Sequence, residues 1–131
     1  MDVNFISEGF LHQLVKDVGL ETMPVLMKTF EKGAREHIRA LKTAAPNTDD
    51  GLEKIRFHGH ALKGMAQSLG LPALSALGAH LEMRSKKLQN NPATMDLQFW
   101  PRATEIIAVL EALLRESLRA LQDWLSALNN R

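Results

Sequence analysis

Apolar residues recur at intervals of three and four positions along most of the chain, which is the spacing of one face of an α-helix. Short breaks at Gly19, residues 45–48, Gly70 and residues 90–92 interrupt the pattern. The pattern predicts five helices, over residues 7–18, 22–41, 50–69, 72–89 and 101–128. Because short connections favour antiparallel neighbours, we expect an all-α fold, an up-down antiparallel four-helix bundle with an additional N-terminal helix. Residues 1–131 are expected to form this single domain.

The ends of the predicted helices carry local signals. Asp50 is expected to be the N-cap of the third helix, because Glu53 three residues later completes a capping box. Gly70 is expected to end that helix, and Pro72 to occupy the first position of the next one. Residues 93–100 fit either an extra helical turn or a loop covered by Phe99 and its neighbour.

The composition of the chain excludes several classes of function. The absence of cysteine rules out a disulfide framework and thiolate metal sites, and it fits a reducing compartment. The formal charge of +1, with both signs interspersed, predicts no binding to nucleic acid. No apolar run approaches the roughly 20 residues that span a bilayer, and the first residues lack the pattern of a signal peptide. We therefore expect a cytoplasmic protein that does not bind membranes.

His60 is the most informative residue of the third predicted helix. On a wheel of about 100° per residue, one apolar stripe of that helix must face the core. The stripe consists of Leu52, Ile55, Gly59, Leu62, Ala66 and Leu69. His60 lies roughly 130° from the centre of the stripe, so its side chain is expected to be exposed. Arg56 and Lys63 flank it, and Gly64 leaves room one turn later for a bulky group or a partner.

The turn between the third and fourth helices predicts a partner for His60. His60 is eleven residues before Leu71, and Glu82 is eleven residues after it. The two side chains should therefore lie level in an antiparallel hairpin. A carboxylate that accepts the Nδ1–H of a neutral imidazole leaves Nε2 as a nucleophilic lone pair. The same count places Gly78 level with Gly64, so we expect the surface near the histidine to be low on both helices.

Three further polar side chains are candidates for contact with a phosphoryl group on that nitrogen. Lys63 and Lys86 carry positive charge, which stabilises such an anionic group, and Lys86 lies one turn beyond Glu82. Gln67 is a candidate for a hydrogen bond near the same group. The alternative interpretation is an ordinary solvated surface for these three residues, with Glu82 paired only to Lys86.

The segments His60-Ala61-Leu62-Lys63-Gly64, Leu69-Gly70 and Leu81-Glu82 resemble the signature of histidine-containing phosphotransfer (HPt) domains of bacterial multistep phosphorelays. The resemblance implies that the histidine accepts a phosphoryl group from a receiver-domain aspartate. It further implies that the group passes to the aspartate of a response regulator. In this interpretation Lys63 contacts the phosphoryl group, Gly64 gives access to the ring, and Glu82 orients the ring.

The resemblance also defines the expected partners, which are the receiver domains of a hybrid sensor kinase and of a response regulator. Mg²⁺ is expected on the receiver, so we expect no cofactor and no metal site in this chain. His58 and His60 cannot chelate one ion, because their side chains diverge by about 200° on a helix. No glycine-rich phosphate loop is evident, so a relay intermediate is expected rather than an enzyme with an ATP site. One exposed histidine requires only a monomer.

The sequence leaves alternatives open. A helical interaction module would dock on a kinase or receiver without transfer, and the excised phosphoacceptor domain of a chemotaxis-type kinase would carry a similar motif. The chain has Met65 where HPt domains often have a small or hydroxylated residue, and we expect this side chain to pack. Phe57 is predicted to be an exposed contact. The last helix, which includes Trp124, either docks within the bundle or binds a partner.

Overall fold

The computed structural model describes residues 4–92 and 97–130, and this part of the chain is almost entirely helical. The elements are α1 (Glu8–Val18), a short 3₁₀ helix η1 (Leu20–Thr22), α2 (Met23–Lys42), α3 (Asp49–Ser68), α4 (Pro72–Asn90) and α5 (Phe99–Asn129). The predicted all-α class is confirmed. The bounds of each helix agree with the predicted bounds to within two residues.

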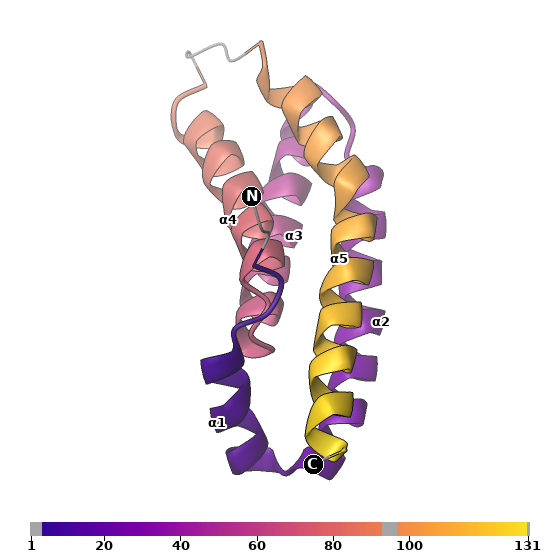
Figure 1. The fold of residues 1–131 in the computed structure, drawn as a ribbon. Coiled ribbons are helices and arrows are strands. Elements are labelled where there is room, and N and C mark those ends of the chain that lie inside the picture. The colour runs from indigo at the N-terminus through magenta and orange to yellow at the C-terminus, as the bar shows by residue number, and fades with distance from the viewer. Residues whose placement is uncertain (1–3, 93–96, 131) are drawn as a thin grey trace.

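Helices α2, α3, α4 and α5 run alternately up and down and form a four-helix bundle (Figure 1). The closest pair is the α3–α4 hairpin, while α2 packs against α3 and α5, and α4 packs against α5. Each helix of the bundle therefore has two neighbours. Helix α1 lies at the end of the bundle where α2 begins (Figure 1), which confirms the predicted additional N-terminal helix.

The apolar stripes of the helices meet in one core. The stripe predicted for α3 is buried along its whole length, and it is joined by α5 residues such as Leu114 and Leu121, which are fully buried. The last helix therefore docks within the bundle. The ring of Trp124 near its end is partly buried and lies edge-on to the ring of His12 in α1, with centroids 5.1 Å apart.

Helix α1 closes the bundle at the turn between α3 and α4. Leu11 is fully buried, and the backbone N–H of Ser7 donates to the carbonyl of Gly70 at 2.8 Å. Gly70 has φ 69°, the left-handed conformation that glycine adopts after a helix end. A Cβ atom at Gly70 would lie 2.9 Å from the ring of Phe10. The glycine that ends α3 therefore also makes room for α1.

The N-cap predicted for α3 is wrong. The N-cap is Thr48, not Asp50, and the Thr48 hydroxyl accepts a hydrogen bond from the N–H of Gly51 at 2.9 Å. Gly51 lies so close to the preceding loop that a Cβ atom there would be 2.0 Å from the carbonyl oxygen of Ala45. This contact fixes the first turn of α3. Glu53 completes no capping box and pairs elsewhere, as described below.

Helix α5 begins at Phe99, two residues before the start that Pro101 suggested. Phe99 is buried and its ring packs edge-on against Trp100, so residues 99 and 100 form a helical turn rather than a loop. Residues 93–96 of the predicted connection lie outside the described residues.

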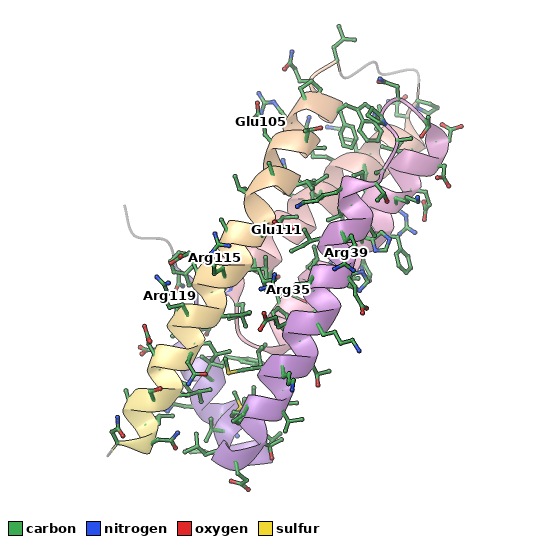
Figure 2. The ribbon with its side chains drawn as sticks, turned by 90° about the vertical axis from the view of Figure 1, so that its right-hand side faces the viewer. Arg35, Arg39, Glu105, Glu111, Arg115 and Arg119 are labelled. Carbon is green, nitrogen blue, oxygen red and sulfur yellow. The ribbon has the colours of Figure 1, made fainter. Side chains whose placement is uncertain are left out.

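The side of the bundle formed by α2 and α5 carries charges of both signs (Figure 2). Lys42 of α2 forms an ion pair with Glu111 of α5, and Arg35 and Arg115 add positive charge near the same carboxylate. The hydrogen bond from Lys42 and the nearby cations lower the pKa of Glu111. Across the described residues, we find no helix whose length and apolarity would let it span a membrane.

Candidate functional site

The α3–α4 hairpin displays His60 to solvent. Its neighbour Gly59 is buried against α4, whereas the His60 side chain is 61 % exposed. The predicted exposure of His60 is therefore confirmed. Gly59 belongs to the apolar stripe of α3 that faces the core, so the side chain of the next residue, His60, points toward solvent.

Two glycines bring α3 and α4 close together at the level of His60. A Cβ atom at Gly59 would lie 3.0 Å from the N atom of Glu82, and one at Gly78 would lie 2.8 Å from the carbonyl oxygen of Gly59. The expectation that Gly78 lowers the surface beside His60 is wrong, because Gly78 is buried in the helix contact. Its effect is to bring Glu82 within reach of the histidine.

His60 and Glu82 are in contact, as the hairpin count predicted. Nδ1 of His60 lies 2.6 Å from Oε2 of Glu82. An ionised carboxylate can only accept a hydrogen bond, so Nδ1 is the donor, and in a neutral imidazole with the proton on Nδ1 the lone pair lies on Nε2. The Glu82 side chain is only 15 % exposed, and its contact with the ring restrains the orientation of the imidazole.

Glu82 also binds Lys63, a contact that the sequence did not predict. Nζ of Lys63 lies 2.7 Å from Oε1 of Glu82, so each carboxylate oxygen has its own partner. The hydrogen bond from Lys63 lowers the pKa of Glu82, and the hydrogen bond from His60 acts in the same direction. The carboxylate is thus kept ionised beside the ring, and Lys63 is held next to His60.

The other predicted residues of the site lie on the same surface. Gly64 is exposed, and a Cβ atom there would meet nothing within 4 Å, so the space beside the ring is open as predicted. Gln67 and Lys86 are exposed. Within residues 4–92 and 97–130, Lys86 forms no ion pair, including none with Glu82.

A second polar network lies on the opposite side of His60 from Gly64. Arg56 donates hydrogen bonds to Glu53, which also accepts one from Gln89 of α4 at 2.7 Å. The hydrogen bond from Arg56, followed by that from Gln89, lowers the pKa of Glu53 to about 2. The guanidinium group of Arg56 therefore binds the carboxylate of Glu53 and does not lie unpaired beside His60.

Three large apolar side chains lie near His60 and Glu82 in the sequence. Phe57 is 54 % exposed, as predicted, and Met83 of α4 is 60 % exposed next to Glu82. Met65 is partly buried against the core, also as predicted.

The sequence interpretation did not predict the pairing of His37 with His58. Their Nδ1 atoms lie 2.8 Å apart between α2 and α3, and burial is the main cause of the lowered pKa of His58. The residue count that placed Glu82 level with His60 could also have found this pair. His37 precedes Asn47 by ten residues and His58 follows Thr48 by ten, so the two side chains lie level in the α2–α3 hairpin. No group of three or more potential metal ligands is found among the described residues.

Comparison with models of known protein families identifies a family for most of the chain. The family model of the Hpt domain matches residues 25–130, which covers α2 to α5 almost completely and leaves α1 outside the match. No curated protein and no solved structure matches the chain.

Proposed function

The chain belongs to the Hpt domain family, and on this basis we propose that it accepts a phosphoryl group from a receiver-domain aspartate on His60 and passes it to the aspartate of a response regulator. Membership of the family indicates a role in histidine phosphotransfer within phosphorelays.

The observation that carries the proposal is the state of the His60 ring. The ring is exposed, and its Nδ1 atom is engaged by Glu82 at 2.6 Å. This leaves Nε2 as the nucleophilic nitrogen, facing away from the carboxylate. Gly64 places no side chain beside it, so an aspartyl phosphate on another protein can approach.

The proposed reaction is an in-line displacement at phosphorus. The lone pair of His60 Nε2 forms the new nitrogen–phosphorus bond as the bond between phosphorus and the aspartate oxygen breaks, and the aspartate leaves as a carboxylate. The proton on Nδ1 stays in the hydrogen bond to Glu82, which stabilises the positive charge that develops on the ring. Transfer to the next receiver reverses these steps.

Lys63 is proposed to contact the phosphoryl group once it is on the ring. In the unphosphorylated chain its Nζ atom is held by Glu82 at 2.7 Å, so a small movement of a flexible side chain brings it to the phosphoryl oxygens. Lys86 and Gln67 are proposed as additional contacts, and their exposed side chains support this. Lys86 is available because it has no ion pair within the described residues.

The partners that we propose are the receiver domains of a hybrid sensor kinase and of a response regulator, with the Mg²⁺ needed for the aspartyl phosphate bound by the receiver. Proteins of the family interact with receivers in phosphorelays. We further propose that residues 1–131 act as one cytoplasmic domain, as a monomer, without an ATP site of its own.

The test is phosphotransfer from radiolabelled, phosphorylated receiver domains to the chain and to its His60→Gln variant. We expect label on the wild-type chain and none on the variant, while His80→Gln, which removes a histidine of α4, is labelled like wild type. Equal labelling of wild type and His60→Gln would contradict the proposal. Binding of a receiver without transfer would favour an interaction module, and labelling only by a kinase with ATP would favour a kinase-derived domain.

A further inference from the structure

His37 of α2 and His58 of α3 form a contact that the proposed function does not use. Their Nδ1 atoms lie 2.8 Å apart, and both side chains are partly buried between the two helices. His58 and His60 point to different sides of α3, because residues two positions apart diverge by about 200° around a helix. The histidine pair therefore joins α2 to α3 on a side of the helix away from His60.

The positions of the two rings identify the contact as a hydrogen bond. The ring centroids are 5.1 Å apart. The centroid of an imidazole lies about 1.15 Å from Nδ1, so two rings placed end to end across the observed nitrogen distance would have centroids about 5.1 Å apart. The centroids and the two Nδ1 atoms thus lie nearly on one line, and each Nδ1 points directly at the other. Two nitrogens bound to one metal ion would instead point to the ion, beside this line.

Only one proton fits between the two Nδ1 atoms. In the neutral pair, one histidine carries its proton on Nδ1 and donates it, while the other carries its proton on Nε2 and accepts. A first added proton binds Nε2 of the donor and leaves the hydrogen bond in place. A second must bind Nδ1 of the acceptor, which already faces an N–H. Its uptake therefore breaks the hydrogen bond and leaves two positive charges side by side.

The immediate surroundings of the pair oppose this doubly charged state. Burial disfavours a charged His58 and lowers its pKa, and the positive charges of His37 and Lys54 act in the same direction. Lys54 has a long ion pair with the exposed Asp50, at 3.9 Å, so its charge is only weakly compensated. The ring of Phe57 packs edge-on against that of His58, with centroids 4.9 Å apart, and restrains its rotation.

The other charged groups of the neighbouring helices give the pair no counter-ion. In the described part of the chain, no carboxylate forms an ion pair with either ring. On α2, Glu36 and Arg39 lie one and two residues from His37, so they point about 100° and 200° away from it. The remaining charged groups belong to other clusters, and they are Glu53 of α3, Glu82 of α4, and Glu111 and Arg115 of α5.

We propose that His37 and His58 share one proton and form a pH-sensitive latch between α2 and α3, which is closed at neutral pH and opens when acid adds the second proton. The latch does not involve His60, so this inference is independent of the proposed function. Its contribution to stability is present above the ordinary histidine pKa of 6.5 and is lost as the pH falls through the lowered pKa of His58. Acid would thus loosen α2 from the helix that carries His60.

Long-range ¹H–¹⁵N NMR of the histidine rings in the full chain tests the shared proton. At pH 7.5 we expect one histidine of the pair to carry its proton on Nδ1 and the other on Nε2. In wild type the two should titrate in two coupled steps, whereas His58 should titrate in one step in His37→Gln. Any other combination of tautomers at pH 7.5, or a titration of His58 that His37→Gln leaves unchanged, would overturn the proposal.

Thermal unfolding at pH 7.5 and pH 5 tests the latch. Gln at position 37 can still form a hydrogen bond but takes up no proton. We therefore expect the melting temperature of wild type to fall by about 2–4 °C more than that of His37→Gln between the two pH values, as loss of a hydrogen bond does in a domain of this size. The control His80→Gln, which removes a histidine of α4, should follow wild type. An equal fall in wild type and His37→Gln would show that the pair is no latch.

Discussion

Glu82 joins the two residues on which the proposed chemistry depends. One of its oxygens contacts Nδ1 of His60 and the other contacts Nζ of Lys63. Phosphorylation adds about −1.5 to −2 charges to the ring, so Lys63 then has a stronger anion within reach than the carboxylate. In the proposed reaction, the His60 contact orients the ring before transfer, and the Lys63 contact supplies a cation that moves to the phosphoryl group of the product.

The lowered pKa of Glu82 leads to a prediction about stability. Because its ionised form is favoured by folding, its contribution is present above the ordinary carboxyl pKa of 4.5 and is lost as the pH falls through the lowered value. We expect Glu82→Gln to reduce the free energy of unfolding by up to about 1 kcal/mol near neutral pH. The difference should shrink as the pH falls below 4.5 and through the lowered pKa.

Urea unfolding near neutral pH and at a series of pH values below 4.5 measures this difference. Glu105→Gln is a suitable control, because it removes an exposed carboxylate from α5. A difference between wild type and Glu82→Gln that stays constant over this range would show that the ionised carboxylate of Glu82 does not stabilise the fold.

Sequence could predict the exposure of His60 and its contact with Glu82, because a helical wheel and a short hairpin turn fix both positions within narrow limits. It could not predict that Lys63 binds Glu82. A lysine side chain is long and flexible, and its choice among nearby carboxylates depends on the distance between the two helices. That distance is set by Gly59 and Gly78, whose mutual contact becomes visible only once α3 and α4 are packed.

In the α3–α4 hairpin, Gly64 and Gly78 are equally far from the turn at Leu71, but they have opposite effects on packing. Gly64 faces open space, whereas Gly78 faces the backbone of α3. Gly64→Ala should therefore stabilise the fold by up to about 1 kcal/mol, the gain in helix propensity. Gly78→Ala should destabilise it by about 1–3 kcal/mol, because a methyl group forces the helices apart.

Thermal unfolding of the two variants beside wild type tests this contrast. We expect the melting temperature to rise for Gly64→Ala and to fall for Gly78→Ala. Shifts of the same sign in both variants would contradict the assigned roles, in which Gly64 gives access and Gly78 gives close packing.

The extents of the helices were predictable because apolar periodicity and the breaks at Gly19, Gly70 and Pro72 act locally. The cap of α3 was not, because Thr48 and Asp50 are both good N-cap residues. The choice depends on the preceding loop, where Asn47 has φ 60° and the carbonyl of Ala45 lies against Gly51. Such contacts bring together residues whose mutual positions the apolar pattern does not define.

In the whole molecule, the α3–α4 hairpin forms one half of the bundle, and α2 and α5 form the other half (Figure 1). The α3–α4 hairpin carries His60, Glu82 and Lys63, while α2 and α5 complete the core behind it. The fold class followed from the sequence, because five amphipathic segments with short connections have few other ways to bury their apolar faces. The position of α1 did not follow, because it depends on the contact of Ser7 with Gly70 across the chain.

We propose that Glu82 makes Nε2 of His60 the atom that receives the phosphoryl group from a receiver. NMR spectroscopy of the chain after transfer from a phosphorylated receiver tests it most directly, because ³¹P coupling to the ring protons identifies the nitrogen that is phosphorylated. We predict a single phosphohistidine, at Nε2 of His60. Phosphorylation at Nδ1 of His60, at another histidine, or at no residue would contradict the account.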